Sequence, residues 1–299
     1  MSIAVIVGVH DGVVIASDSA STLMVTMLPN QMGVANVYDN ANKIFNLYKG
    51  RPIGCVSFGA GSIGNSSIGT LIKDLRARLM RKEEAQKLNF NPDEYAMEGV
   101  SQIVAKFLED ECGRQSDAAR LALNIGLMLA GYSTGKGLGE TWLAEIKAGK
   151  AEKPRQMRKP EEPGVSYGGL SDVIQRILSG YSPLLFQVLA SVSGAQGNAP
   201  VTADDLAKQL TPILRATLQA PLVFAPMPIQ DAIDLARFLV HAAIMYSRFL
   251  PGAQMVGGPI EIAAITKHEG FKWISRKHYY EGELNREPQH VVIDRSEED

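Results

Sequence analysis

The second residue of the chain is a serine, and this position offers chemistry that an internal serine lacks. A small residue after an initiator methionine normally allows removal of that methionine, so we expect Met1 to leave and Ser2 to become terminal. A terminal α-amine has a pKa of about 7.7–8.0, so part of it is an uncharged base near neutral pH. Ser2 would then supply both a nucleophilic hydroxyl and its general base.

Such a nucleophile needs three kinds of neighbour, and the chain offers a candidate for each. A lysine favours the deprotonated nucleophile and lowers the pKa of the α-amine; Lys43 begins a predicted strand. A buried carboxylate compensates the desolvation of that ammonium; Asp18 ends an earlier strand. A backbone N–H at a glycine-rich strand end stabilises an oxyanion; Gly59 occupies such a position.

Each candidate also has an ordinary structural explanation. Ser2 could be a common start residue, and Asp18 could cap a turn. Lys43 could be a solvated strand-edge side chain, and Gly59 with Gly61 could serve only a tight turn. The joint occurrence of all of them in this order favours a functional site.

The elements that must position these residues follow from the pattern of apolar residues. Two β-branched runs, 3–9 and 13–17, flank His10-Asp11-Gly12, and Asp-Gly between such runs predicts a hairpin. The returning strand would carry Asp18 back beside Ser2. Further strands are expected at 43–48, 53–58, 124–131, 141–146, 260–266 and 272–275. Helical spacing predicts helices near 68–79, 92–111, 170–178, 183–192, 202–218 and 229–249.

This order of elements indicates an α+β fold, because strands and helices come in runs and do not alternate strictly. No convincing linker interrupts residues 1–276, so a single domain is expected there. The polar residues 277–299 end in acid and are predicted to be a peripheral tail.

The composition limits the classes of function. The formal net charge of −2 leaves no electrostatic footprint for nucleic acid or an anionic membrane. Only two cysteines, Cys55 and Cys112, are present, which favours a reducing cytoplasm. No signal peptide or membrane span is expected. The five histidines show no metal-ligand spacing and residues 133–137 lack the phosphate-loop pattern, so neither a metal nor a cofactor is predicted.

Several segments, in order along the chain, resemble proteasome β-type subunits and their bacterial HslV relatives. The matching segments are 5–19, 42–45, 57–61, 127–132, 257–263, 265–266 and 270–273. The resemblance implies an N-terminal nucleophile (Ntn) hydrolase with a four-layer αββα sandwich. It also implies that Ser2, Asp18 and Lys43 form the active centre and that the N–H of Gly59 supplies the oxyanion hole.

The same resemblance suggests further site residues. Ser166 and Tyr167 fall where relatives have a serine before Gly-Gly, so they are candidates to support the nucleophile. Ser57 and Phe45 are expected to shape the substrate pocket. The chain also departs from the family: its nucleophile is serine where threonine is usual, and residues 251–256 contain neither a carboxylate nor a hydroxyl. Residues about 179–228 exceed the family core and are predicted to be a helical insertion.

The predicted function is that of a proteasome-like peptidase that forms an acyl-enzyme on Ser2. The resemblance implies a closed homo-oligomeric ring acting on peptides or unfolded chains; an ATP-driven unfoldase partner is compatible with it, although no residue points to one. Two alternatives are a non-catalytic structural member of the same fold and an amidase acting on a small molecule. Retention of Met1 would block the amine and exclude the peptidase.

Overall fold

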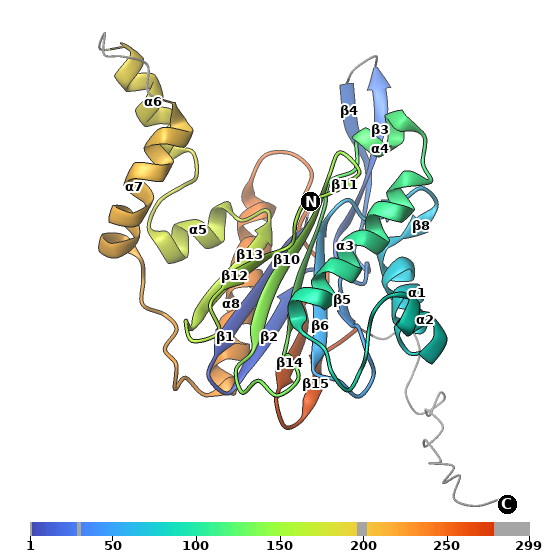
Figure 1. Cartoon of the computed structure of the whole chain (residues 1–299). Helices are drawn as coiled ribbons and strands as arrows, with labels where there is room; N and C mark the ends of the chain where they lie inside the picture. The colour runs from blue at the N-terminus through green and yellow to red at the C-terminus, as the bar shows by residue number, and fades with distance from the viewer. Residues whose placement is uncertain (1, 29–30, 196–201, 278–299) are drawn as a thin grey trace, which may run out of the picture.

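The computed structural model describes residues 2–28, 31–195 and 202–277, and two antiparallel sheets dominate it (Figure 1). The first sheet has the strand order β13 (Gly164–Gly169), β1 (Ile3–Val9), β2 (Gly12–Ser17), β14 (Glu261–Thr266) and β15 (Gly270–Ser275). In order across the second lie β11 (Lys150–Ala151), β10 (Glu140–Lys147), β9 (Ile125–Gly131), β6 (Ile53–Gly59) and β5 (Ile44–Asn46), with β12 (Arg155–Arg158) also paired to β10. The α+β pattern read from the sequence is thus observed as a mixed α/β protein with antiparallel sheets.

The predicted hairpin at the start of the chain is present. Strand β1 pairs with β2 from Ala4 opposite Ser17 to Val9 opposite Gly12, which brings the residue after β2 back to the start of β1. Because side chains alternate along a strand, β1 has two apolar faces. Ile3 and Val5 pack with helices, whereas Ala4 and Ile6 pack against the second sheet.

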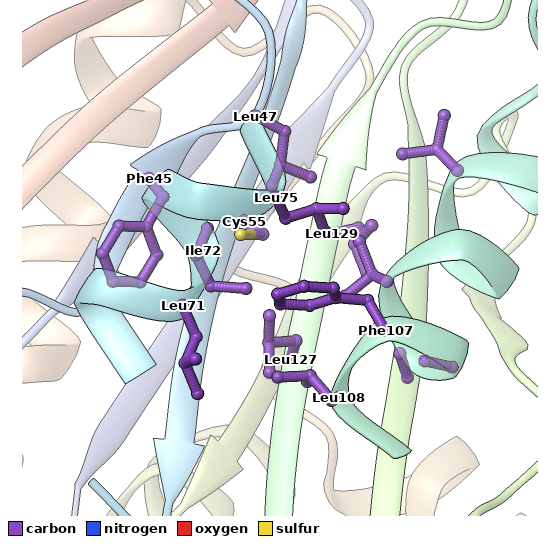
Figure 2. Packing of buried hydrophobic residues seen from close by; sticks show 14 of the residues in the cluster. Phe45, Leu47, Cys55, Leu71, Ile72, Leu75, Phe107, Leu108, Leu127 and Leu129 are labelled. Carbon is purple, nitrogen blue, oxygen red and sulfur yellow. The ribbon is translucent and has the colours of Figure 1, made fainter. Parts of the chain in front are cut away.

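Helices cover the outer faces of both sheets. Helices α5 (Asp172–Ser179) and α8 (Ile229–Phe249) share a buried cluster with β1, β2 and β14. Helices α1 (Ile68–Leu79) and α3 (Met97–Gly113) share another with β5, β6 and β9; Figure 2 shows Leu71, Ile72 and Phe107 packed over Leu127 and Leu129. A third buried cluster lies between the two sheets.

The spacing of apolar residues predicted α1 correctly, and a side chain caps its first turn. The Ser67 hydroxyl accepts a hydrogen bond from the Thr70 N–H at 3.1 Å. Helix α3 begins at Met97, five residues later than the predicted start at Pro92. The Asn91 side chain accepts from the Asp93 N–H, forming a turn, and the Ser133 hydroxyl accepts from the Met97 N–H at 2.9 Å. A contact distant in sequence therefore sets the start of this helix.

Several elements lie outside these layers. Strands β3 (Ser21–Leu28) and β4 (Gln31–Tyr38) form a separate hairpin that projects beyond the sheets, in a stretch for which the sequence predicted no strand (Figure 1). Helices α6 (Leu185–Ala195) and α7 (Ala203–Leu218), within the predicted insertion, pair with each other and stand away from the sheets (Figure 1). The remaining short elements are β7 (Ser62–Ile63), β8 (Ser66–Ser67), α2 (Lys82–Lys87) and α4 (Asp117–Leu121).

Candidate active site

The carboxylate of Asp18 is the centre of the polar cluster at the start of β1. Asp18 is fully buried, and each of its oxygens accepts two hydrogen bonds. Oδ1 accepts from Lys43 Nζ at 2.6 Å and from the Ile3 N–H at 3.0 Å. Oδ2 accepts from the N–H groups of Ala20 and Gly257 at 3.2 and 3.1 Å. These donors compensate the cost of burying the charge, so Asp18 can act as a fixed anchor.

Lys43 is held directly before β5 and is 5% exposed. Its carbonyl accepts from the Ser57 N–H at 2.9 Å, which ties its main chain to β6, and its ammonium ion-pairs with Asp18. Burial lowers the pKa of the Lys43 ammonium, Asp18 opposes this change, and the positive charge of Lys277 adds to it. A lysine with a lowered pKa beside a carboxylate is an electrostatic arrangement typical of functional sites.

Ser2 is held through its main chain from two sides. Its carbonyl accepts from the Leu170 N–H at 2.8 Å, and the next residue, Ile3, donates to Asp18. Gly169 has φ +86°, and a Cβ there would overlap the carbonyl oxygen of Ser2. Glycine therefore permits a close approach of the two chains, which fixes the start of β1.

Gly59 ends β6 with φ +91°, a conformation that glycine adopts without strain. A Cβ at this position would lie 2.5 Å from the carbonyl oxygen of Asn124. The following N–H, that of Ala60, donates to the same carbonyl at 2.9 Å. The chain thus turns sharply at the end of the strand.

One cavity of about 790 Å³ joins the predicted residues, and we call it the Ser2 cavity. Ser2, Lys43, Ser57 and Gly59 line it, while Asp18 is buried behind Lys43. The other walls come mainly from residues 20–22, 40–42, 58–61 and 67–70. Its volume falls in the range of about 300–1,000 Å³ common for ligand pockets.

Three predicted site residues do not line this cavity. Phe45 belongs to the cluster beneath α1 and lies behind Gly69. Tyr167 pairs with Val5 and shares the face of the first sheet that packs against helices. Ser166 pairs with Ile6, which is about 13 Å along the strand from Ser2 at 3.3 Å per residue. These three residues therefore lie apart from the cavity that Ser2 lines.

A second buried ion pair lies next to the first, and the sequence did not indicate it. Lys277 Nζ lies 2.7 Å from Glu261 Oε2 and donates to Ser19 Oγ and to the Ala41 carbonyl, both at 2.8 Å. Burial lowers the pKa of Lys277, and Glu261 opposes that change. The sequence did contain one sign of this pair: Glu261 begins an apolar strand, and a glutamate is rarely buried without a partner. Lys277 itself was expected in the peripheral tail.

The described residues offer no metal-ion cluster and no membrane-spanning helix. Within residues 2–28, 31–195 and 202–277, no group of three or more His, Cys, Asp or Glu side chains could hold a metal ion. Of the helices in the part of the chain that the structure describes, none is long and apolar enough to cross a membrane.

Comparison with known proteins adds evidence on the fold. No protein-family model matches the chain, and no curated protein sequence does. Among solved structures, a Gly-1 mutant of Anbu from Hyphomicrobium sp. strain MC1 matches with a TM-score of 0.51 and 14% identity, covering 94% of this chain and 90% of that chain. Anbu (ancestral beta-subunit) from Yersinia bercovieri matches with a TM-score of 0.47 and 14% identity, covering 92% and 88%.

The match to the Anbu structure from Hyphomicrobium sp. strain MC1 corrects the resemblance to proteasome β-type subunits and HslV. The matched structures are Anbu, a proteasome-like family of Ntn hydrolases that is related to HslV but distinct from it. Assignment of the chain to the proteasome β-subunit and HslV-like family was therefore wrong. The segments that suggested it form a hairpin and strand ends, and such elements reflect a shared fold and do not separate its families. At 14% identity the likeness shows the fold alone.

Proposed function

We propose that the chain is a proteasome-like peptidase whose nucleophile is Ser2, freed by removal of Met1. The observation that carries the proposal is the convergence on one cavity of Ser2, Lys43 and the strand end at Gly59, with Asp18 fixing Lys43 from behind. The likeness to an Anbu structure supports an Ntn-hydrolase fold around that cavity.

In this mechanism the Ser2 hydroxyl attacks a peptide carbonyl while the α-amine of the same residue accepts its proton. The positive charge of Lys43 favours the alkoxide and lowers the pKa of the amine. The N–H of Gly59 donates to the oxyanion. The C–N bond then breaks, the leaving amine takes the proton, and an ester on Ser2 remains. Water hydrolyses that ester, with the α-amine again accepting a proton.

We further propose that the helix, sheet, sheet and helix layers form a four-layer αββα sandwich in one domain, with residues about 179–228 inserted. Three apolar clusters, one between the sheets and one on each outer face, support this layering. The insertion exposes several large apolar side chains, which supports a homo-oligomer: Leu184, Val188, Val192, Ile213, Leu218 and Phe224. Two buried free cysteines fit a reducing cytoplasm.

The direct test uses an electrophilic peptide, such as a peptide vinyl sulfone, with mass spectrometry of the intact protein and of its fragments. We expect loss of Met1 and one adduct on Ser2. Ser2→Ala should abolish both the adduct and peptide hydrolysis, whereas Ser191→Ala, on the exposed face of α6, should change neither. An adduct elsewhere, or hydrolysis that survives in Ser2→Ala, would refute the proposal.

A non-catalytic structural role remains the second candidate, and one observation favours it. Met255 lines the Ser2 cavity in a segment, 251–256, that has no carboxylate or hydroxyl to support the nucleophile. Intact mass separates the two functions, because retained Met1 would block the α-amine and leave the fold without a general base. Fluorogenic peptides compared with small amides would then separate a peptidase from an amidase.

A further inference from the structure

Four cationic side chains line a second cavity, of about 340 Å³, and we call it the basic cavity. Lys73 and Arg76 come from α1, Lys49 from the turn after β5, and Arg276 from the position after β15. Lys73 also lines the Ser2 cavity, so the two cavities are neighbours. The positive charge is a local feature, because the whole chain has a formal net charge of −2.

The described part of the chain supplies no carboxylate partner to these four cations. Within residues 2–28, 31–195 and 202–277, none of the four has a carboxylate oxygen within 4.0 Å. One carboxylate does line the cavity, that of Glu261, but its Oε2 already lies 2.7 Å from Lys277 Nζ. The four positive charges are therefore uncompensated among the described residues.

The two guanidinium groups of the basic cavity repel each other. Burial lowers the pKa of Arg76, and the positive charge of Arg276 lowers it further. Arg276 Cζ lies 5.0 Å from the centre of the Trp273 ring, which is also part of the cavity wall. A cation–π contact thus holds this guanidinium at the wall. Because like charges held together repel, an anion bound between them would stabilise both.

The kinds of cation on the wall narrow the class of anion. An arginine presents its N–H groups in a planar fork that matches two oxygens of a phosphate, whereas a lysine acts as a point charge. The cavity holds two of each, so a ligand with a single charge would leave most of them uncompensated. The volume lies near the lower end of the range of about 300–1,000 Å³ for ligand pockets, so the charged part of the ligand must be compact. A small group with several charged oxygens fits both requirements.

We propose that the basic cavity binds a diphosphate group, either as the free anion or as part of a small molecule. Arg76 and Arg276 hold the phosphate oxygens, and Lys49 and Lys73 neutralise the remaining charge. The site does not depend on the function proposed for Ser2, because none of these four side chains has a step in that mechanism.

Isothermal titration of the full-length protein with inorganic diphosphate tests the proposal, at about 0.15 M salt so that long-range attraction is screened. We expect saturable binding at one site per chain, with inorganic phosphate and sulfate each weaker by about tenfold or more. Arg76→Met, which keeps the length of the side chain, should weaken diphosphate by about 10- to 100-fold, the loss expected for hydrogen bonds to a charged group. Arg276→Met should act in the same direction. Binding of ADP as tight as that of diphosphate would support a nucleotide as the ligand, and weaker binding of ADP would support the free anion.

Arg78→Met is the matched control, because Arg78 lies on the same helix but outside the cavity, with its guanidinium 5.4 Å from the centre of the Phe107 ring. It and Ser2→Ala should bind diphosphate as the unaltered chain does, and circular dichroism would verify that each variant is folded. Equal affinity in folded Arg76→Met and Arg78→Met would overturn the proposal, and so would the absence of saturable diphosphate binding. Phosphate that binds as tightly as diphosphate would overturn the assignment of a ligand with two phosphoryl groups.

Discussion

The buried pair between Lys277 and Glu261 makes the sharpest quantitative prediction about this fold. The Lys277 side chain is 12% exposed and that of Glu261 is 2% exposed, so Lys277→Met leaves a carboxylate buried without its cation. It also removes the donor to Ser19 Oγ and to the Ala41 carbonyl. Breaking one side of a buried pair costs about 3–5 kcal/mol, and we expect the free energy of unfolding to fall by that amount.

Removing the charge of the other partner, Glu261, should lower the free energy of unfolding by less. Glu261→Gln keeps the shape of the side chain, and the Lys277 ammonium retains two neutral acceptors, so the expected loss is about 1–3 kcal/mol. In the double variant neither charge is left unpaired. Its loss should therefore be smaller than the sum of the two single losses by about 1–3 kcal/mol.

Equilibrium unfolding in urea near neutral pH, followed by circular dichroism, measures all three losses. Lys159→Met is the matched control, because Lys159 is exposed and its ion pair with Glu162 spans 3.8 Å; it should cost no more than about 1 kcal/mol. The reasoning would be refuted if the double variant lost as much unfolding free energy as the two single variants together. It would also be refuted if Lys277→Met lost no more unfolding free energy than Lys159→Met.

The same variant should act on the candidate active site. The positive charge of Lys277 is one cause of the lowered pKa of Lys43, so its removal should raise that pKa. NMR titration of the isotope-labelled lysine ε-carbons would measure the change, and Lys159→Met should leave the Lys43 resonance unaffected. An unchanged pKa in Lys277→Met would mean that the two pairs are electrostatically independent.

Three further predictions use other parts of the fold. Gly169→Ala should destabilise the protein in urea by more than Gly135→Ala, because both positions have positive φ but only at Gly169 would a Cβ meet the main chain, at the Ser2 carbonyl. Partial burial raises the pKa of Tyr95 to about 12, so its contribution to stability should be complete below pH 10 and lost as pH rises to about 12; ultraviolet titration compared with Tyr95→Phe would detect this ionisation. Burial also raises the pKa of the Cys55 thiol, so iodoacetamide should modify it only after unfolding; modification of the native protein would contradict its placement.

Local signals in the sequence predicted the parts of the site that depend on neighbouring residues. The Asp-Gly turn and two β-branched runs were sufficient to return Asp18 to the start of β1. The positions of Lys43 and Gly59 at strand ends were read in the same way, and both line the cavity with Ser2.

Side-chain direction was harder to predict, because it depends on strand register. A shift of one residue moves a side chain to the opposite face of a sheet. The pairing of β1 with β13 turns Tyr167 toward the helices and leaves Ser166 far from Ser2, and Phe45 points beneath α1. No local pattern in the sequence encodes these pairings.

The sequence by itself determined many strands of the two sheets, although not β11, β12 or β13, together with the first hairpin and the presence of Ser2, Asp18, Lys43 and Gly59 at strand ends, since periodicity and turn chemistry act over a few residues. Only the tertiary structure decided that Gly257 donates to Asp18 and that Lys277 joins Glu261 beside Lys43. The contact between Gly257 and Asp18 joins residues 239 positions apart. The other contact involves Lys277, which begins a segment whose composition indicated a tail. They form because buried charges must find partners wherever packing brings the chain together.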